Sequence, residues 1–151
     1  MSKVIHPIAG AVALLMIASF WLSTVIVELS GRAATIATVK SMIPWGFSVL
    51  IPALIVAAIS GRSLAKKRGG PILARKQKRM PFIAANGILI LVPSAFYLSF
   101  KAQAGDMDVG FYLVQALELI AGAVNITLLG LNTADGLRLS GKLRRPPVSR
   151  G

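Results

Sequence analysis

Residues 4–27 read VIHPIAGAVALLMIASFWLSTVIV, and this stretch decides the class of fold. It contains no Asp, Glu, Lys or Arg, and it exceeds the roughly 20 apolar residues that a helix needs to cross a membrane. It is also longer than the apolar part of a secretory signal, and no A-x-A cleavage site follows it. The stretch is therefore predicted to be an uncleaved membrane-spanning helix.

Three more apolar stretches follow, and two of them open with proline at Pro44 and Pro81, which suits the first turn of a helix. We predict an all-α fold, an integral membrane four-helix antiparallel bundle that forms one domain over residues 1–151. Its predicted parts are spans at 4–27, 43–60, 81–100 and 111–131, a basic loop at 61–80 and a basic tail at 132–151.

Composition supports this class and excludes others. Hydrophobic residues make up 55% of the 151 residues, only 15% are charged, and the mean hydropathy is +0.72. A soluble domain carries about 25% charged residues, and a disordered chain is far less apolar. The chain has no Cys, which excludes disulfides and thiol chemistry.

The net charge of +12 is distributed unevenly, and this predicts the orientation. Of the 17 Lys and Arg residues, 14 fall in the basic loop, in the basic tail or at Lys3. The positive-inside rule makes that side cytoplasmic, so both termini are predicted to face the cytoplasm of a bacterial inner (plasma) membrane. The opposite side holds three cations and three acids: Arg32, Lys40, Lys101, Glu28, Asp106 and Asp108.

The basic loop is predicted to bind anionic lipid headgroups, since each Lys or Arg near a membrane surface contributes about 1 kcal/mol to that attraction. Residues 63–80 contain no aromatic side chain, so we expect no nucleic-acid partner. The predicted headgroup-binding residues are Arg62, Lys66, Lys67, Arg68, Arg75, Lys76, Lys78 and Arg79.

Small residues predict where the helices pack closely. Ala53, Ala57 and Gly61 recur every four residues, and Ala9 and Ala13 have the same spacing. Such edges let helix backbones approach in lipid, and they also favour a homo-oligomer or a larger membrane complex.

Two breaks are expected in the helices. Pro52 and Pro93 lie inside predicted spans, and each should kink its helix. Gly69-Gly70-Pro71 should divide the basic loop into two helical extensions.

A polar stripe on the fourth span is the strongest candidate for a site. Gln115, Glu118, Gly122, Asn125 and Asn132 share one helical face, which must look into the bundle or another subunit. Two interpretations are open for this polar intramembrane site: hydrogen bonds that fix the register, or a small polar pocket or proton path.

A partner for the stripe follows from the hairpin that joins spans three and four near Asp106. Residues symmetric about that turn lie at equal depth, which places Asn86 opposite Asn125 or Ile126. The same symmetry places Ser94 or Tyr97 opposite Glu118 or Gln115. Two polar stripes are therefore predicted to meet.

Glu118 is the only acid well inside a predicted span, and no Lys or Arg is expected at its depth. Tyr97, Ser94, Ser23 and Thr24 are its predicted hydrogen-bond partners. An intramembrane carboxyl is a functional hypothesis by default.

His6 is the only histidine, and it precedes Pro7 at the start of the first span. It is predicted to be an interfacial residue, with an axial ligand to a b-type haem as the alternative. One His and no Cys do not form a zinc site, so we expect no metal and no cofactor apart from that haem.

The sequence contains no Ser-His-Asp set, phosphate-binding Gly-rich loop or pair of carboxylates on one face. We therefore expect no catalytic residues and a non-enzymatic accessory or scaffold subunit that packs with itself, another membrane protein or lipid. One alternative is a small proton-coupled transporter or channel using Glu118, and the second is a haem-binding redox subunit using His6.

Overall fold

A computed structural model describes residues 2–66 and 70–141, apart from the side chains of residues 2 and 3. Within these ranges the chain is helical and contains no strand. The elements are α1 (Ser2–Ser30), α2 (Ala33–Ala65), α3 (Pro71–Asn86), the π-helical turn η1 (Gly87–Leu91), α4 (Val92–Gln103) and α5 (Val109–Leu139).

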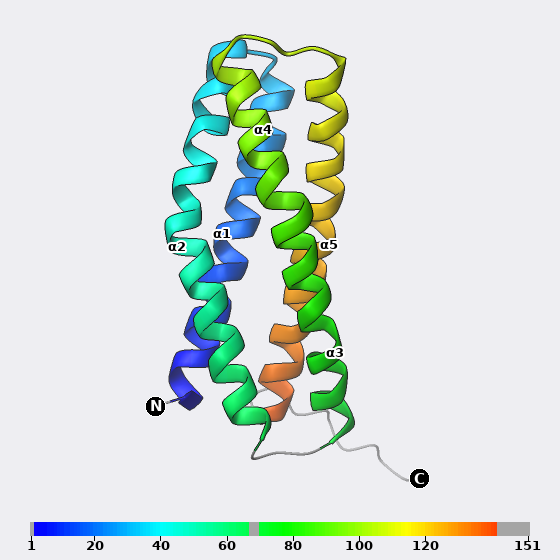
Figure 1. The fold of residues 1–151 in the computed structure, drawn as a ribbon. Helices are drawn as coiled ribbons and strands as arrows, with labels where there is room; N and C mark the ends of the chain where they lie inside the picture. The colour runs from blue at the N-terminus through cyan, green and yellow to red at the C-terminus, as the bar shows by residue number, and fades with distance from the viewer. Residues whose placement is uncertain (1, 67–69, 142–151) are drawn as a thin grey trace, which may run out of the picture.

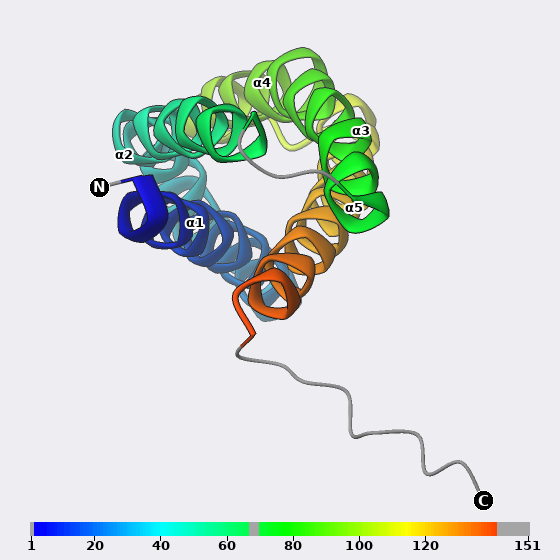
Figure 2. The ribbon, with the colours of Figure 1, turned by 90° about the horizontal axis from the view of Figure 1, so that it is seen from below.

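These elements form four helical spans, because α3, η1 and α4 follow one another without a break over Pro71–Gln103. Each span is long and apolar enough to cross a membrane. In Figure 1 the chain rises through α1, descends through α2, rises again through α3 and α4, and descends through α5. Seen along the bundle in Figure 2, the spans form a ring in which α1 lies between α2 and α5.

The bundle therefore has two different ends. At the short-turn end, α1 meets α2 through Gly31 and Arg32, and α4 meets α5 through residues 104–108. At the basic end lie the start of α1, the end of α2, the start of α3 and the end of α5 (Figure 1). Gly31 has a φ of +63°, a left-handed conformation that glycine adopts without steric cost.

The second span begins ten residues earlier than predicted. Residues 33–42, expected to be outside the membrane, continue α2 as helix. Ile36, Lys40, Ile43 and Phe47 recur at helical spacing and are all buried. Lys40, predicted to lie outside the spans, is thus a buried residue of the helix that contains the second span.

The predicted small-residue edges do pack, and α1 makes its most extensive contact with α2. Ala9, Ala13 and Ala57 are buried, and a Cβ on Gly61 would lie 3.0 Å from the ring of His6. A Cβ on Gly46 would collide with the ring of Phe20. Small residues thus admit larger rings from α1 at the α1–α2 contact.

The predicted break before residue 71 is present: α2 ends at Ala65 and α3 starts at Pro71. Pro93 has a clear effect, because the turn just before it, Gly87–Leu91, is π-helical. Proline lacks the N–H that would bond one turn back, and a wider turn accommodates that loss. Pro52, in contrast, lies within an uninterrupted α-helix.

Candidate functional site

A buried ion pair joins α2 to α5 near the short-turn end. The Nζ atom of Lys40 donates to Oε2 of Glu118 at 2.6 Å and to Oγ1 of Thr24 at 3.3 Å. The Lys40 side chain is 0% exposed and that of Glu118 is 12% exposed. The prediction that no cation lies at the depth of Glu118 is therefore wrong.

Two more polar residues complete this group, which we name the outer centre: Thr24, Glu28, Lys40, Gln115 and Glu118. Gln115 Nε2 lies 3.4 Å from the same Glu118 oxygen that Lys40 binds. Glu28, from the last turn of α1, interacts electrostatically with both Lys40 and Glu118. The outer centre thus combines groups from α1, α2 and α5. It contains two carboxylates, those of Glu28 and Glu118, although the sequence has no pair of carboxylates on one helical face.

Two buried oxygen atoms of the outer centre have no hydrogen-bond partner in the described part of the chain. They are Glu28 Oε1 and Gln115 Oε1, both buried and without a hydrogen bond in the described part of the chain. A buried acceptor without a donor costs free energy, and more so in a membrane, where no bulk water competes. Within residues 4–66 and 70–141, they are the buried polar side-chain atoms left without a hydrogen bond.

None of the four predicted partners, Tyr97, Ser94, Ser23 and Thr24, hydrogen-bonds to Glu118 in the described part of the chain. Among the described residues, neither Ser94 nor Tyr97 hydrogen-bonds to Glu118 or Gln115. Ser94 is buried elsewhere in the core, and the Tyr97 hydroxyl lies against Gly110, 3.1 Å from where a Cβ would stand. Thr24 and Glu118 are linked through Lys40, which donates to both.

The middle of the bundle carries the contact that the hairpin symmetry predicted. Asn86 Nδ2 donates to Asn125 Oδ1 at 2.9 Å and to the Ala121 carbonyl at 2.8 Å. Asn125 Nδ2 lies 3.4 Å from the Ile83 carbonyl. The predicted pairing of Asn86 with Asn125 is confirmed, and it ties α3 to α5 just before the π-helical turn.

A second ion pair, only partly buried, lies at the basic end. Arg79 Nη1 donates to Asp135 Oδ2 at 2.8 Å, and Asn132 Oδ1 is 3.5 Å from the same nitrogen. Arg138 adds a longer contact to Asp135 at 3.7 Å. The polar stripe of α5 therefore continues to Asp135, within the segment predicted as the basic tail.

This changes the expected headgroup-binding set. Lys76 and Arg79 turn toward the bundle, where Lys76 Nζ lies 3.3 Å from His6 Nε2. The exposed members are Arg62, Lys66, Arg75 and Lys78, while Lys67 and Arg68 lie outside the described residues. The spacing of Arg75, Lys76, Lys78 and Arg79 on one helix explains the division, because they point to different sides of it.

His6 is held between α2 and α3 and is not free at the interface. Its Nδ1 atom lies 3.0 Å from the Ala57 carbonyl and 3.2 Å from Ser60 Oγ, and Nε2 faces Lys76. A haem iron would have to displace one of these contacts. Among the described residues, no group of three or more His, Cys, Asp and Glu could hold a metal ion.

A third charged cluster is exposed at the short-turn end. Lys101 forms ion pairs with Asp106 and, at 2.8 Å, with Asp108. Asp108 also caps α5 by accepting from the Phe111 N–H at 2.9 Å. The Lys101 ammonium and then this backbone donor hold the pKa of Asp108 below its ordinary value.

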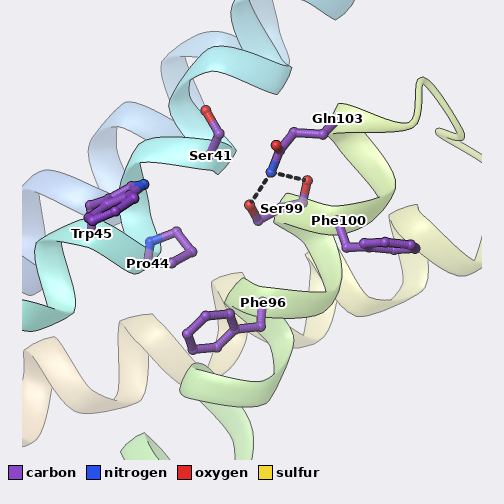
Figure 3. Close-up of a pocket in the computed structure, with 7 residues that line it drawn as sticks. All are labelled: Ser41, Pro44, Trp45, Phe96, Ser99, Phe100 and Gln103. Carbon is purple, nitrogen blue, oxygen red and sulfur yellow. Dashed lines mark hydrogen bonds between the residues drawn. The ribbon is translucent and has the colours of Figure 1, made fainter.

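The outer surface carries a groove between α2 and α4. Figure 3 shows its seven lining residues, with Trp45 and Phe96 on opposite walls. The groove has a volume of about 460 Å³, and Trp45 and Phe100 are 82% and 75% exposed. Its lining residues are Ser41, Pro44, Trp45, Phe96, Ser99, Phe100 and Gln103.

No family model matches the chain, and no curated protein or solved structure matches it either. The function is therefore inferred from the fold and from the charged groups inside it.

Proposed function

We propose that this protein is a non-enzymatic multi-pass protein of the bacterial inner membrane, an accessory or scaffold subunit with both termini in the cytoplasm. The observation that carries the proposal is the contrast between interior and surface. Inside, polar groups of different helices bond mostly to one another, as in the pairs Asn86–Asn125 and Arg79–Asp135. Outside, large apolar side chains of all four spans are exposed, as expected of a surface against lipid or partner helices.

The proposed orientation can be tested with single cysteines, because the chain has none of its own. Ala104→Cys is at the short-turn end and Lys66→Cys is at the basic end, and both positions are exposed. A membrane-impermeant maleimide should label Ala104→Cys in intact spheroplasts and Lys66→Cys only after permeabilisation. The reverse pattern would overturn the cytoplasmic assignment of the termini.

The scaffold role is tested at the α2–α4 groove. A photo-crosslinking amino acid at Trp45 should give a protein adduct of discrete mass in native membranes, either a dimer or a complex with another subunit. Ile120, exposed on the far face of α5, is the matched control position. If both positions capture lipid alone, the scaffold proposal fails.

A second candidate, a proton-coupled transporter or channel, is favoured by the outer centre. Glu28, Lys40 and Glu118 are three ionisable groups inside candidate spans, a rare and costly arrangement. Purified protein in vesicles with a pH-sensitive dye inside should then conduct protons under a potassium-diffusion potential, and Glu118→Gln should abolish the flux. Flux no greater than in empty vesicles would remove this candidate.

The third candidate, a haem-binding redox subunit, would need His6 as a ligand. Both ring nitrogens of His6 have partners, so the fold offers this candidate no specific support. A Soret band in protein expressed with added haem, lost in His6→Ala, would restore it.

A further inference from the structure

The outer centre contains one more negative group than positive group. Glu28 and Glu118 face one cation, Lys40, and these are the charged groups that act on Glu28 from α2 and α5. Glu118 takes the close contact with Lys40, at 2.6 Å. With both carboxylates ionised, one negative charge would have no cation of its own beside the buried Oε1 atom of Glu28, which is unfavourable.

The two unpaired buried atoms in the outer centre are both oxygen atoms that accept hydrogen bonds. Gln115 is 4% exposed, its amide nitrogen points to Glu118, and its Oε1 atom has no donor. Glu28 Oε1 is likewise a buried acceptor without a donor. The centre therefore needs one additional positive charge and one additional hydrogen-bond donor.

A proton meets both needs, whereas a metal ion does not. Hard metal cations bound by oxygen take about six ligands, and the Lys40 ammonium, 2.6 Å from Glu118, repels a second cation. A proton on Glu28 removes the excess charge and converts an unpaired acceptor into a donor.

We propose that the outer centre is a proton-binding site in which Glu28 carries the proton beside the Lys40–Glu118 ion pair. The step is an acid–base equilibrium: the Glu28 carboxylate takes H⁺ from water to form an O–H bond, and release returns the same proton. Glu28 belongs to the last turn of α1, and its carbonyl accepts from Gly31 N in the exposed turn that follows. Protons therefore enter and leave on the side of the short-turn end.

This inference assigns the proton to Glu28 in place of Glu118, and it does not depend on the accessory role. It deepens the second candidate function, but a binding site does not require transport. Vesicles without proton flux would leave it standing, whereas the spectroscopic test below addresses it directly.

The test is infrared difference spectroscopy of the purified full-length protein in lipid nanodiscs, titrated with acid and base. A protonated buried carboxyl gives a carbonyl band that shifts in D₂O. We expect one such band per chain near neutral pH. Glu28→Asp should displace the band in frequency, while Glu118→Asp should leave its frequency unchanged.

Variants that change the number of charged groups in the outer centre extend the spectroscopic test. Lys40→Met leaves two carboxylates without a cation, so proton uptake should rise from one to two per chain. Glu118→Gln leaves one carboxylate with one cation, so the band should disappear near neutral pH. Asp106→Asn, an exposed acid at the same end, is the control and should change neither.

Three outcomes would overturn the proposal. One is the absence of a carboxyl band across the titration, and another is a band displaced by Glu118→Asp but not by Glu28→Asp. The third is a titration midpoint that moves when sodium replaces choline in the buffer, which would identify a metal cation as the compensating charge.

Discussion

The two ends of α5 each hold a buried acid that pairs with a cation from another helix, yet the ends differ in charge balance. Glu118 pairs with Lys40 at 2.6 Å, and Asp135 pairs with Arg79 at 2.8 Å. The outer centre adds a second acid, whereas the basic end adds further cations around Asp135.

Exposure differs as well. The Lys40 side chain is 0% exposed, while that of Arg79 is 24% exposed and can extend toward water if its partner is lost. Similar pair distances therefore describe two kinds of site. At the basic end, the pair that joins α3 to α5 is surrounded by more cations than acids. In the outer centre, two acids share one cation.

The largest expected effect is on the outer pair. Lys40→Met removes the cation that pairs with Glu118, so that carboxyl must stay uncompensated or take up a proton, and the change should lower the free energy of unfolding by about 3–5 kcal/mol. The measurement is denaturation by SDS in mixed micelles, followed by circular dichroism. The double variant Lys40→Met/Glu118→Leu should recover most of the loss, and a single variant as stable as the wild type would contradict the comparison.

The corresponding change at the basic end should cost less. Asp135→Leu removes charge-assisted hydrogen bonds from Arg79, a loss of about 1.5–3 kcal/mol. The same denaturation assay applies, with Asp135→Asn as the variant of matched shape. Should Asp135→Leu prove as damaging as Lys40→Met, the two ends would be equivalent and the distinction would fail.

The uncharged contact between Asn86 and Asn125, in the middle of the bundle, gives a reference for the loss of unfolding free energy at the two ion pairs. Asn86→Leu removes interhelical hydrogen bonds, which average about 0.6 kcal/mol each in membrane bundles. The control is Thr127→Val, because the Thr127 hydroxyl bonds only within its own helix and is exposed. A loss above that of Asp135→Leu would mean that neutral contacts dominate the packing.

The smallest effect is expected at the exposed cluster of Lys101 and Asp108. The pKa of Asp108 lies below its ordinary value of 3.8, so its contribution to stability is complete above that value. The contribution is lost as the pH falls through the lowered pKa. Asp108→Ala should therefore lower the melting temperature slightly at neutral pH, and the difference from wild type should shrink in acid. A difference that persists unchanged at the lowest pH would show that Asp108 acts without its charge.

The sequence predicted most of the scaffold. Four spans follow from local hydropathy, which is a property of each segment alone. The contact between Asn86 and Asn125 could be predicted because a short turn fixes the register of two neighbouring helices. The burial of Ala13 and Ala57 followed from small-residue spacing, for the same local reason.

The outer centre could not be derived in the same way. A lysine near a span is usually a sign that the span has ended, so Lys40 appeared to lie outside the membrane. One signal for the burial of Lys40 was available, since it shares a helical face with Ile36, Ile43 and Phe47. This signal applies only if the helix extends back to Ala33, which the sequence alone does not establish. That extension is stabilised by a partner far away in the chain.

The sequence by itself thus determined how many helices are long and apolar enough to cross a membrane, and which faces are apolar. Tertiary structure decided where the charges lie. Lys40 enters the interior only because Glu118, 78 residues later in the chain, lies opposite it on α5. A buried charge is tolerable only beside its counter-charge, so its position depends on the packing of several helices at once.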